Sequence, residues 1–388
     1  MKIVEIRERP VSIRSAISNA YISFSEMTVS AAVIITDVVR DGRPVVGYGF
    51  NSNGRYSQSG IIGDRLIPRL MRAAPEDLLD DEGTNFDPFK AWRVMMSNEK
   101  PGGHGERSVG VGVLDMAFWD LAAKVEGKPL YQLLADRFNK GKMDAAVSVY
   151  AAGGYYYPGK DVSVLQDEMR RYLDLGYDTV KIKIGGAPLD EDLKRIEAVL
   201  KLVPSGRNLA VDANGRFDLA TATAYAKALD PYGLKWYEEP GNPLDFDLNR
   251  EVGHVSATPI ATGENLFSMQ DARNLIRYGG MTSDRDYLQM DPALSYGLVE
   301  YLRTLEMIGE NGWSARRCIP HGGHQFALHI AAGLGLGGAE SYPGVFEPFG
   351  GFADDIPIED GHVRPSETPG IGVETKPKLM KVYEDLSA

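Results

Sequence analysis

Hydrophobic and polar positions change their rhythm along the chain. Residues 1–50 alternate as antiparallel strands do, in the runs IVEIRERPVSI, AAVIITDVV and PVVGYGF. From about residue 61 to residue 140 the apolar positions recur at helical spacing, for example in GVGVLDMAFWDLAAK and PLYQLLADRF. A run of strands followed by a run of helices predicts an α+β domain over residues 1–140.

After residue 140, short apolar strands alternate with longer amphipathic segments such as LDEDLKRIEAVLKLV. The strand candidates are AAVSVYAA, YDTVKIKI, NLAVDAN, LKWYEEP, PIATGEN, YLQMDPA, RRCIPHGG and ESYPGVFEPFG. Eight such units predict an α/β fold, a (β/α)8 TIM-type barrel over residues 141–354. An open doubly wound sheet is the alternative, but the near-even length of the units favours closure. Residues 355–388 are expected to complete the α+β capping domain.

Composition narrows the classes of function. The net charge of −12 argues against nucleic acid or an anionic membrane surface as the main partner. A small anionic substrate stays open, because clustered lysines can reverse the sign inside a pocket. The single cysteine, Cys318, cannot form an intrachain disulfide, and the first residues lack the apolar core of a secretion signal. No apolar run approaches the roughly 18 residues of a membrane span, so we expect a soluble, cytoplasmic protein.

Charged residues end successive strand candidates, roughly one every 25 to 30 residues, which is the length of one βα unit. They are Asp212 in VDAN, Glu238 in YEEP, Glu264 in TGEN, Asp291 in QMDP and His321 in IPHGGH. Equivalent positions on a barrel meet at its C-terminal mouth, where catalytic groups converge. Three converging carboxylates require a cation, and hard oxygen ligands suit one Mg²⁺. The alternative is a set of solvated loop charges, which would not explain the regular spacing. Glu239 faces the opposite way from Glu238, and the residues alone do not show which of the two is the ligand.

Two lysines in TVKIKIGG, Lys181 and Lys183, point to the same face of a strand. If that face is the barrel interior, mutual repulsion, desolvation and a nearby Mg²⁺ would lower their pKa values and allow Lys183 to act as a base. Lys181 would stay charged and modulate the site. Surface lysines on an edge strand are the alternative. Asp291 beside His321 would fix the imidazole tautomer and make a positioned acid or base.

This combination, Lys181-Ile182-Lys183 with the carboxylate series and His321, resembles the enolase superfamily, mandelate racemase group, over essentially the whole chain. The resemblance implies that Glu238, the first Glu of EEP, is the metal ligand. It also implies that Mg²⁺ binds a substrate carboxylate and stabilises the enediolate formed when the α-proton is removed. For the eighth-strand acid that hydrogen-bonds this carboxylate, Glu340 is preferred over Glu347.

Within the group, KIKIGGAPLDEDLKRIEAV and CIPHGGHQFALHIAAGLGLGGAESYPGVF are most similar to the D-tartrate dehydratases. The similarity implies a hydro-lyase that converts D-tartrate to oxaloacetate and water. Lys183 would take the proton at C2, and His321 would protonate the departing C3 hydroxyl. Capping-domain loops set specificity in this group, which makes candidate substrate contacts of residues 18–21 (with Ser18, Asn19 and Tyr21) and residues 51–53 (with Asn51 and Asn53). Lys100 and His104 in NEKPGGHGER are further candidates. The resemblance also implies a homo-oligomer.

Other functions fit parts of this pattern. The same chemistry could serve another acid sugar, or Lys183 and His321 could act as the two bases of a racemase. A zinc-dependent barrel hydrolase would use His321, His324 and His329, although their spacing does not match a tight zinc motif. A barrel without catalytic activity is disfavoured, because every proposed acid, base and ligand is present.

Overall fold

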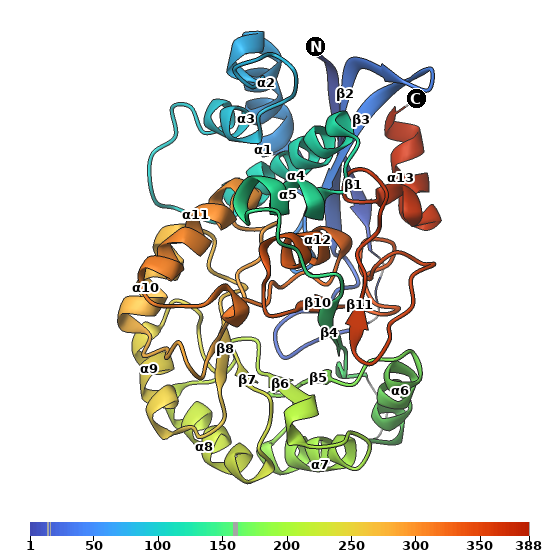
Figure 1. Cartoon of the computed structure of the whole chain (residues 1–388). Helices are drawn as coiled ribbons and strands as arrows, with labels where there is room; N and C mark the ends of the chain where they lie inside the picture. Colours follow the sequence, from blue (N-terminus) through green and yellow to red (C-terminus); the bar gives the residue numbers. More distant parts are fainter. Residues whose placement is uncertain (14, 16, 158–161, 388) are drawn as a thin grey trace.

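The computed structural model describes the chain apart from residues 14, 16, 158–161 and 388. Figure 1 shows a capping domain, blue to teal, above a ring of strands and helices coloured green to orange. The predicted α/β class, a parallel barrel with an N-terminal α+β cap, is confirmed. None of the described helices combines the length and the apolar character that crossing a bilayer requires.

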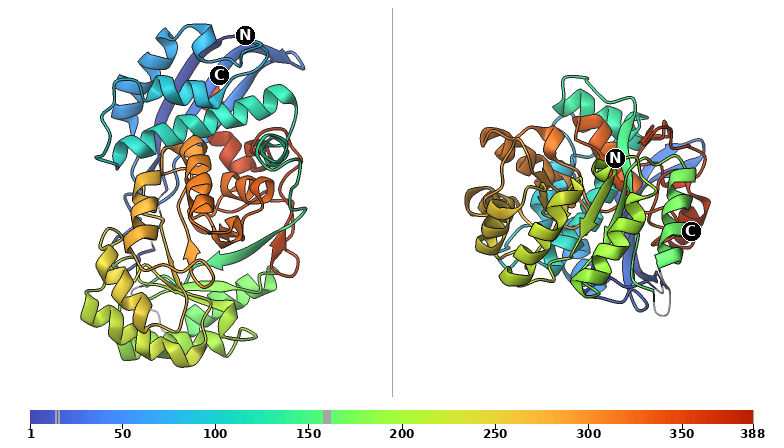
Figure 2. Two further views of the ribbon diagram at one scale, coloured as in Figure 1. Left: turned by 60° about the vertical axis from the view of Figure 1, so that its left-hand side comes forward. Right: turned by 90° about the horizontal axis from the view of Figure 1, so that it is seen from below.

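The capping domain is built on an antiparallel sheet of β1 (Ile3–Ser12), β2 (Thr28–Arg40) and β3 (Arg43–Phe50). Its helices are α1 (Ser59–Ile61), α2 (Ile67–Arg72), α3 (Pro88–Met95), α4 (Glu106–Glu126) and α5 (Leu130–Phe138). The backbone of α4 touches β3, because a Cβ at Gly49 would lie 2.0 Å from the carbonyl oxygen of Val113. The other side of α4 packs against the barrel helix α11 (Gly297–Glu310), so this buried helix joins cap and barrel (Figure 2, left).

In the described part of the chain, seven parallel strands follow one another around the lower ring, and the last of them pairs with the first. They are β4 (Val147–Ala152), β5 (Val180–Lys183), β6 (Leu209–Asp212), β7 (Tyr237–Glu238), β8 (Ile260–Thr262), β9 (Tyr287–Leu288) and β10 (Ala339–Ser341). Besides α11, the helices between them are α6 (Val162–Asp174), α7 (Leu189–Leu200), α8 (Leu219–Leu229), α9 (Phe246–Val255), α10 (Met269–Tyr278) and α12 (Gln325–Leu334). Side-chain oxygens of Asp218 and Asp245 accept from the backbone N–H three residues on and fix the starts of α8 and α9.

The end of the barrel departs from the predicted eight equal units. The segment RRCIPHGG forms a single parallel bridge, Cys318 to Leu288, and the N–H of Gly337 donates to the carbonyl of Cys318 at 2.9 Å. Among the described residues, no barrel helix follows β10. The chain instead forms β11 (His362–Val363), which pairs with β4, and α13 (Pro377–Ser387), which packs on β2 of the cap. The Tyr383 hydroxyl of α13 donates to the Gly49 carbonyl at 2.9 Å. The last helix of the chain therefore contacts the cap and does not take the position of an eighth barrel helix.

Candidate functional site

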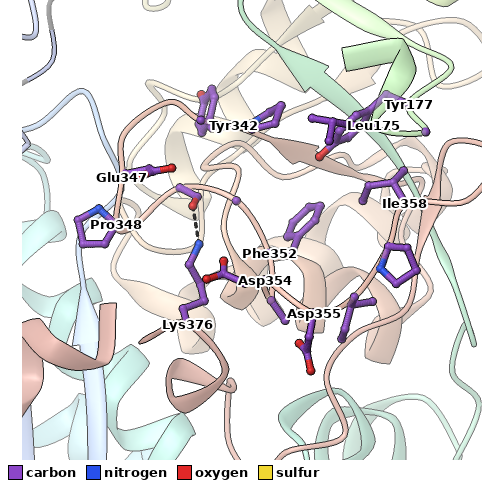
Figure 3. A pocket seen from close by; sticks show the side chains of 18 of the residues that line it. Leu175, Tyr177, Tyr342, Glu347, Pro348, Phe352, Asp354, Asp355, Ile358 and Lys376 are labelled. Carbon is purple, nitrogen blue, oxygen red and sulfur yellow. Dashed lines mark hydrogen bonds between the residues drawn. The ribbon is translucent and has the colours of Figure 1, made fainter. Parts of the chain in front are cut away.

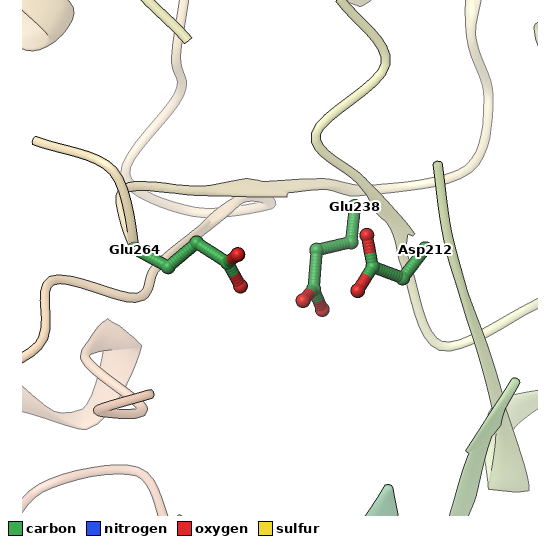
Figure 4. A group of neighbouring side chains, drawn as sticks. All are labelled: Asp212, Glu238 and Glu264. Atoms are coloured by element: carbon green, nitrogen blue, oxygen red, sulfur yellow. The ribbon is translucent and has the colours of Figure 1, made fainter. Parts of the chain in front are cut away.

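Strand register brings the charged residues into one row. Lys183 on β5 is level with Asp212 on β6, and Asp212 is level with Glu238 on β7. Glu264 comes two residues after the end of β8, the next strand. Figure 4 shows that the side chains of Asp212, Glu238 and Glu264 converge, and one carboxylate oxygen of each lies within 4.8 Å of the others. The residues that recur at regular spacing in the sequence therefore meet at one mouth of one barrel.

The geometry distinguishes the two adjacent glutamates. Glu238 points into the carboxylate group and accepts hydrogen bonds from Trp236 Nε1 (2.7 Å) and Gln289 Nε2 (2.9 Å). Glu239 turns away with φ 39°, and its two oxygens accept from Asn265 Nδ2 at 2.9 and 3.0 Å. Glu238, and not Glu239, thus belongs to the acidic triad of Asp212, Glu238 and Glu264.

The acidic triad has the properties of a hard-cation site. Its ligand atoms are all oxygens, and Asp212 and Glu238 are fully buried. Burial, together with the neighbouring carboxylates, raises the pKa of Glu238 to about 8 against the opposing charge of Lys181. A divalent cation would relieve this crowding of negative charge, so the residues fit Mg²⁺.

The histidines do not form a zinc site. The ring of His324 contacts the Ser52 hydroxyl at 2.7 Å, and the ring of His329 accepts from the backbone N–H of Tyr131 at 3.3 Å. Burial lowers the pKa of His324 to about 4 and that of His329 to about 3, so both are neutral packing groups. Within the part of the chain that the structure describes, the acidic triad is the one group of His, Cys, Asp or Glu side chains close enough to hold a metal.

Both lysines of β5 point into the barrel, where carboxylates surround them. Lys181 Nζ lies 2.5 Å from Glu238 and 2.8 Å from Glu340, and Lys183 Nζ lies 2.5 Å from Asp212. The sequence predicts a lowered pKa for Lys183, but the protein groups around this lysine together do not lower it. Burial lowers it most, but the carboxylates of Asp212, Glu264 and Glu238 together outweigh burial and the charge of Lys181, and the pKa is raised above its usual value. The pKa of Lys181 is raised well above its usual value for the same reason.

His321 is held as a positioned acid at the opposite end of the triad from Lys183. Its Nδ1 lies 2.7 Å from Asp291, and its Nε2 lies 3.7 Å from Glu264. Burial lowers its pKa, but Glu264, Glu340 and Asp291 together raise it to about 10. The imidazole therefore carries both ring protons at neutral pH, with Nδ1 toward Asp291 and Nε2 toward Glu264.

The two candidates for the eighth-strand acid lie in different places. Glu340 on β10 is fully buried, 2.8 Å from Lys181 and 3.8 Å from His321 Nε2. Glu347 borders a second cavity of about 710 Å³, which Tyr342 also lines (Figure 3). The Glu347 carboxylate pairs with Lys378 at 2.6 Å. In that cavity Lys376 donates to the carbonyl of Gly350. The lining of this second cavity includes none of the acidic triad, so Glu340 is the acid at the site.

The candidate active site is a cavity of about 520 Å³ between the capping loops and the barrel mouth, and Lys183, Glu264 and His321 line it. Four of the predicted capping-domain contacts also line it, namely Asn19, Tyr21, Asn53 and His104. Asn51 and Lys100 do not. Asn51 is fully buried and bonded to backbone, accepting from the N–H of Ser30 at 2.7 Å, and Lys100 is exposed on its loop.

Several residues at the site were not predicted. The Tyr342 hydroxyl lies 3.1 Å from His321 Nε2, and Trp236 and Gln289 hold Glu238. Each lies next to the end of a strand and two residues along the chain from a predicted residue, as side chains on one face of an extended segment do. That alternation is the signal that could have found them. Arg55, from the capping loop after β3, carries no such signal.

The chain was compared with known proteins. The profile of the family described as "Enolase C-terminal domain-like" matches residues 164–379. Arabinonate dehydratase of Saccharolobus solfataricus is 28% identical over 361 residues, which cover 90% of each chain. L-talarate/galactarate dehydratase of Salmonella typhimurium is 26% identical over 88% of this chain and 80% of its own. A solved structure of L-talarate dehydratase from Polaromonas sp. JS666, complexed with Mg and L-glucarate, is 25% identical with a TM-score of 0.75, over 95% of this chain and 92% of that one.

Proposed function

Because the chain belongs to the enolase C-terminal domain-like family, we propose that it is a Mg²⁺-dependent dehydratase that removes water from a hydroxy acid. One observation carries the proposal: a lysine and a histidine border the same cavity at opposite ends of a three-carboxylate group. A base and an acid in these positions would lie on either side of one bound substrate. The names of two relatives, arabinonate dehydratase and L-talarate/galactarate dehydratase, support the same reaction class.

In the proposed reaction Lys183 Nζ takes the proton from C2 of the substrate. The C3–O bond breaks, and the hydroxyl leaves as water with the proton from His321 Nε2. The resulting enol becomes a 2-keto acid when its hydroxyl loses a proton and C3 takes one up. Asp291 keeps the His321 ring oriented, while Lys181 and Glu340 form the charged floor below the substrate carboxylate. When bound by Asp212, Glu238 and Glu264, Mg²⁺ would supply positive charge that acidifies the C2 hydrogen and lowers the pKa of Lys183.

For the substrate we propose a small hydroxy-diacid, D-tartrate, which would yield oxaloacetate. The support is the similarity of the residues around Lys183 and His321 to the D-tartrate dehydratases. A longer acid sugar of five or six carbons is the second candidate, because the cavity of about 520 Å³ is large for a four-carbon acid.

The test is keto-acid formation with Mg²⁺ over a panel of tartrate stereoisomers and five- and six-carbon acid sugars. EDTA-treated enzyme and a Lys183→Ala variant serve as controls. Turnover of D-tartrate supports the full proposal, whereas turnover of longer acids alone refutes the tartrate assignment and keeps the mechanism. Exchange of the C2 hydrogen in deuterated water without keto acid, seen by ¹H NMR, would show a racemase instead.

A further inference from the structure

Arg55 lies in the candidate active-site cavity, on the capping-domain side. It belongs to the loop after β3, and it lines the same cavity as Lys183 and His321. Among the described residues that line the cavity, Lys183 is the one lysine and Arg55 is the one arginine. Since Lys183 is assigned to proton removal and His321 to proton donation, Arg55 is the cation left to bind an anion.

Within the described part of the chain, the guanidinium of Arg55 has no carboxylate partner. Among the described residues, none of the ion pairs includes Arg55. One Nη donates to the carbonyl of Gly54 at 2.7 Å, and the other donates to Asn265 Oδ1 at 2.6 Å. A guanidinium has five N–H donors, so donors remain for a ligand. A half-buried arginine left without an anion, in a chain of net charge −12, is a binding group for an anionic ligand.

The protein holds this guanidinium firmly in place. Its carbon lies 4.8 Å from the centre of the Phe267 ring, which supports one face. Asn51 Nδ2 donates to the carbonyls of Ser52 and Arg55, at 3.0 and 2.9 Å, and so fixes the loop that carries the arginine. Asn51, predicted to touch substrate, therefore supports a neighbour that faces the cavity.

Arg55 is connected to the acidic triad through one side chain. Asn265 accepts from Arg55 and donates to Glu264 Oε1 at 3.4 Å, next to the proposed metal position. A substrate whose first carboxylate lies at the metal would direct its far end toward the cap. We propose that Arg55 binds the second carboxylate of the substrate and thereby makes the enzyme selective for diacids. This inference rests on the proposed function and adds the residue that reads the far end of the substrate.

The test compares matched substrates in wild type, Arg55→Gln and Arg55→Lys. Tartrate is compared with 2,3,4-trihydroxybutanoate, in which a hydroxymethyl replaces one carboxylate, and galactarate with galactonate. We expect Arg55→Gln to lower kcat/KM for the diacid by roughly 10- to 100-fold, mainly through KM, and to change the monoacid by less than about three-fold. Arg55→Lys should recover part of the loss. Arg303→Gln is the control, because Arg303 also stacks on a ring, that of Trp92 at 4.2 Å, but lies outside the cavity.

Equal losses for diacid and monoacid, or no loss for either, would overturn the inference and show that Arg55 only ties cap to barrel. If wild type forms no keto acid at all, the proposed function fails, and calorimetric binding of succinate and butyrate to the Mg²⁺-loaded protein still decides the role of Arg55. Tighter binding of succinate than butyrate in wild type, lost in Arg55→Gln, supports the inference. Equal binding of the two acids contradicts it.

Discussion

Lys181 is the counter-ion of two fully buried glutamates, Glu238 and Glu340, and replacing it should reveal the energetic cost of burying them. Its side chain is 1% exposed, and its Nζ lies 2.5 Å from Glu238 and 2.8 Å from Glu340. In Lys181→Met the methylene packing is largely kept while the charge is lost. Removing one partner of a buried ion pair costs about 3–5 kcal/mol, because the remaining charge stays desolvated. At about 2 °C per kcal/mol for a large domain, the thermal midpoint should fall by about 6–10 °C.

The assay is thermal unfolding followed by circular dichroism, with EDTA and with saturating Mg²⁺. Without the Lys181 ammonium, a cation has one competitor fewer for the carboxylates, so Mg²⁺ should raise the midpoint more in Lys181→Met than in wild type. Lys235→Met is the matched control. Lys235 precedes β7 at the other end of the barrel, and it is in no ion pair among the residues described. We expect its midpoint to stay within about 2 °C of wild type. Equal midpoints for Lys181→Met and wild type, with and without Mg²⁺, would refute the reasoning.

Three further predictions follow from the site. Lys183→Ala should reduce keto-acid formation at least about 1,000-fold and keep Mg²⁺ affinity in calorimetry, and joint loss of both would make the lysine structural. Asp291→Asn should lower kcat at least about 100-fold and lower the pKa of His321 measured by NMR, and an unchanged pKa would count against the pair. Burial lowers the pKa of Lys376 to about 8 from its ordinary 10.5, so the unfolded chain binds this proton more readily and stability rises between these two pH values. Urea unfolding measures the free energy of unfolding of wild type and of Lys376→Met. From pH 7 to pH 10.5 the difference between these two free energies should change by about 3 kcal/mol in favour of wild type, and a constant difference would contradict the low pKa.

The carboxylate row was predictable because it depends on local rules. One βα unit separates Asp212, Glu238 and Glu264, and parallel register sets such residues side by side without any knowledge of the loops. The same alternation on β5 placed Lys181 and Lys183 on one inner face. The structure brings these residues together as the pattern indicated.

The parts that could not be predicted depend on long-range contacts. Arg55 faces the cavity, while Asn51, four residues earlier, is consumed by backbone hydrogen bonds, and the loop sequence does not distinguish them. The position of an eighth barrel helix was lost because the C-terminal segment packs on the capping sheet through Tyr383. The pKa of Lys183 depends on its 2.5 Å contact with Asp212, a distance that spacing alone cannot give.

The most direct test of the central claim is calorimetric titration of Mg²⁺ into wild type, Glu238→Gln and Glu239→Gln. The two glutamates are adjacent in sequence, but only Glu238 belongs to the acidic triad, whereas Glu239 is bonded to Asn265. We predict one Mg²⁺ per chain in wild type and in Glu239→Gln, and loss of binding in Glu238→Gln. Retained binding in Glu238→Gln would contradict the claim that three carboxylates from neighbouring strands hold one divalent ion beside Lys183.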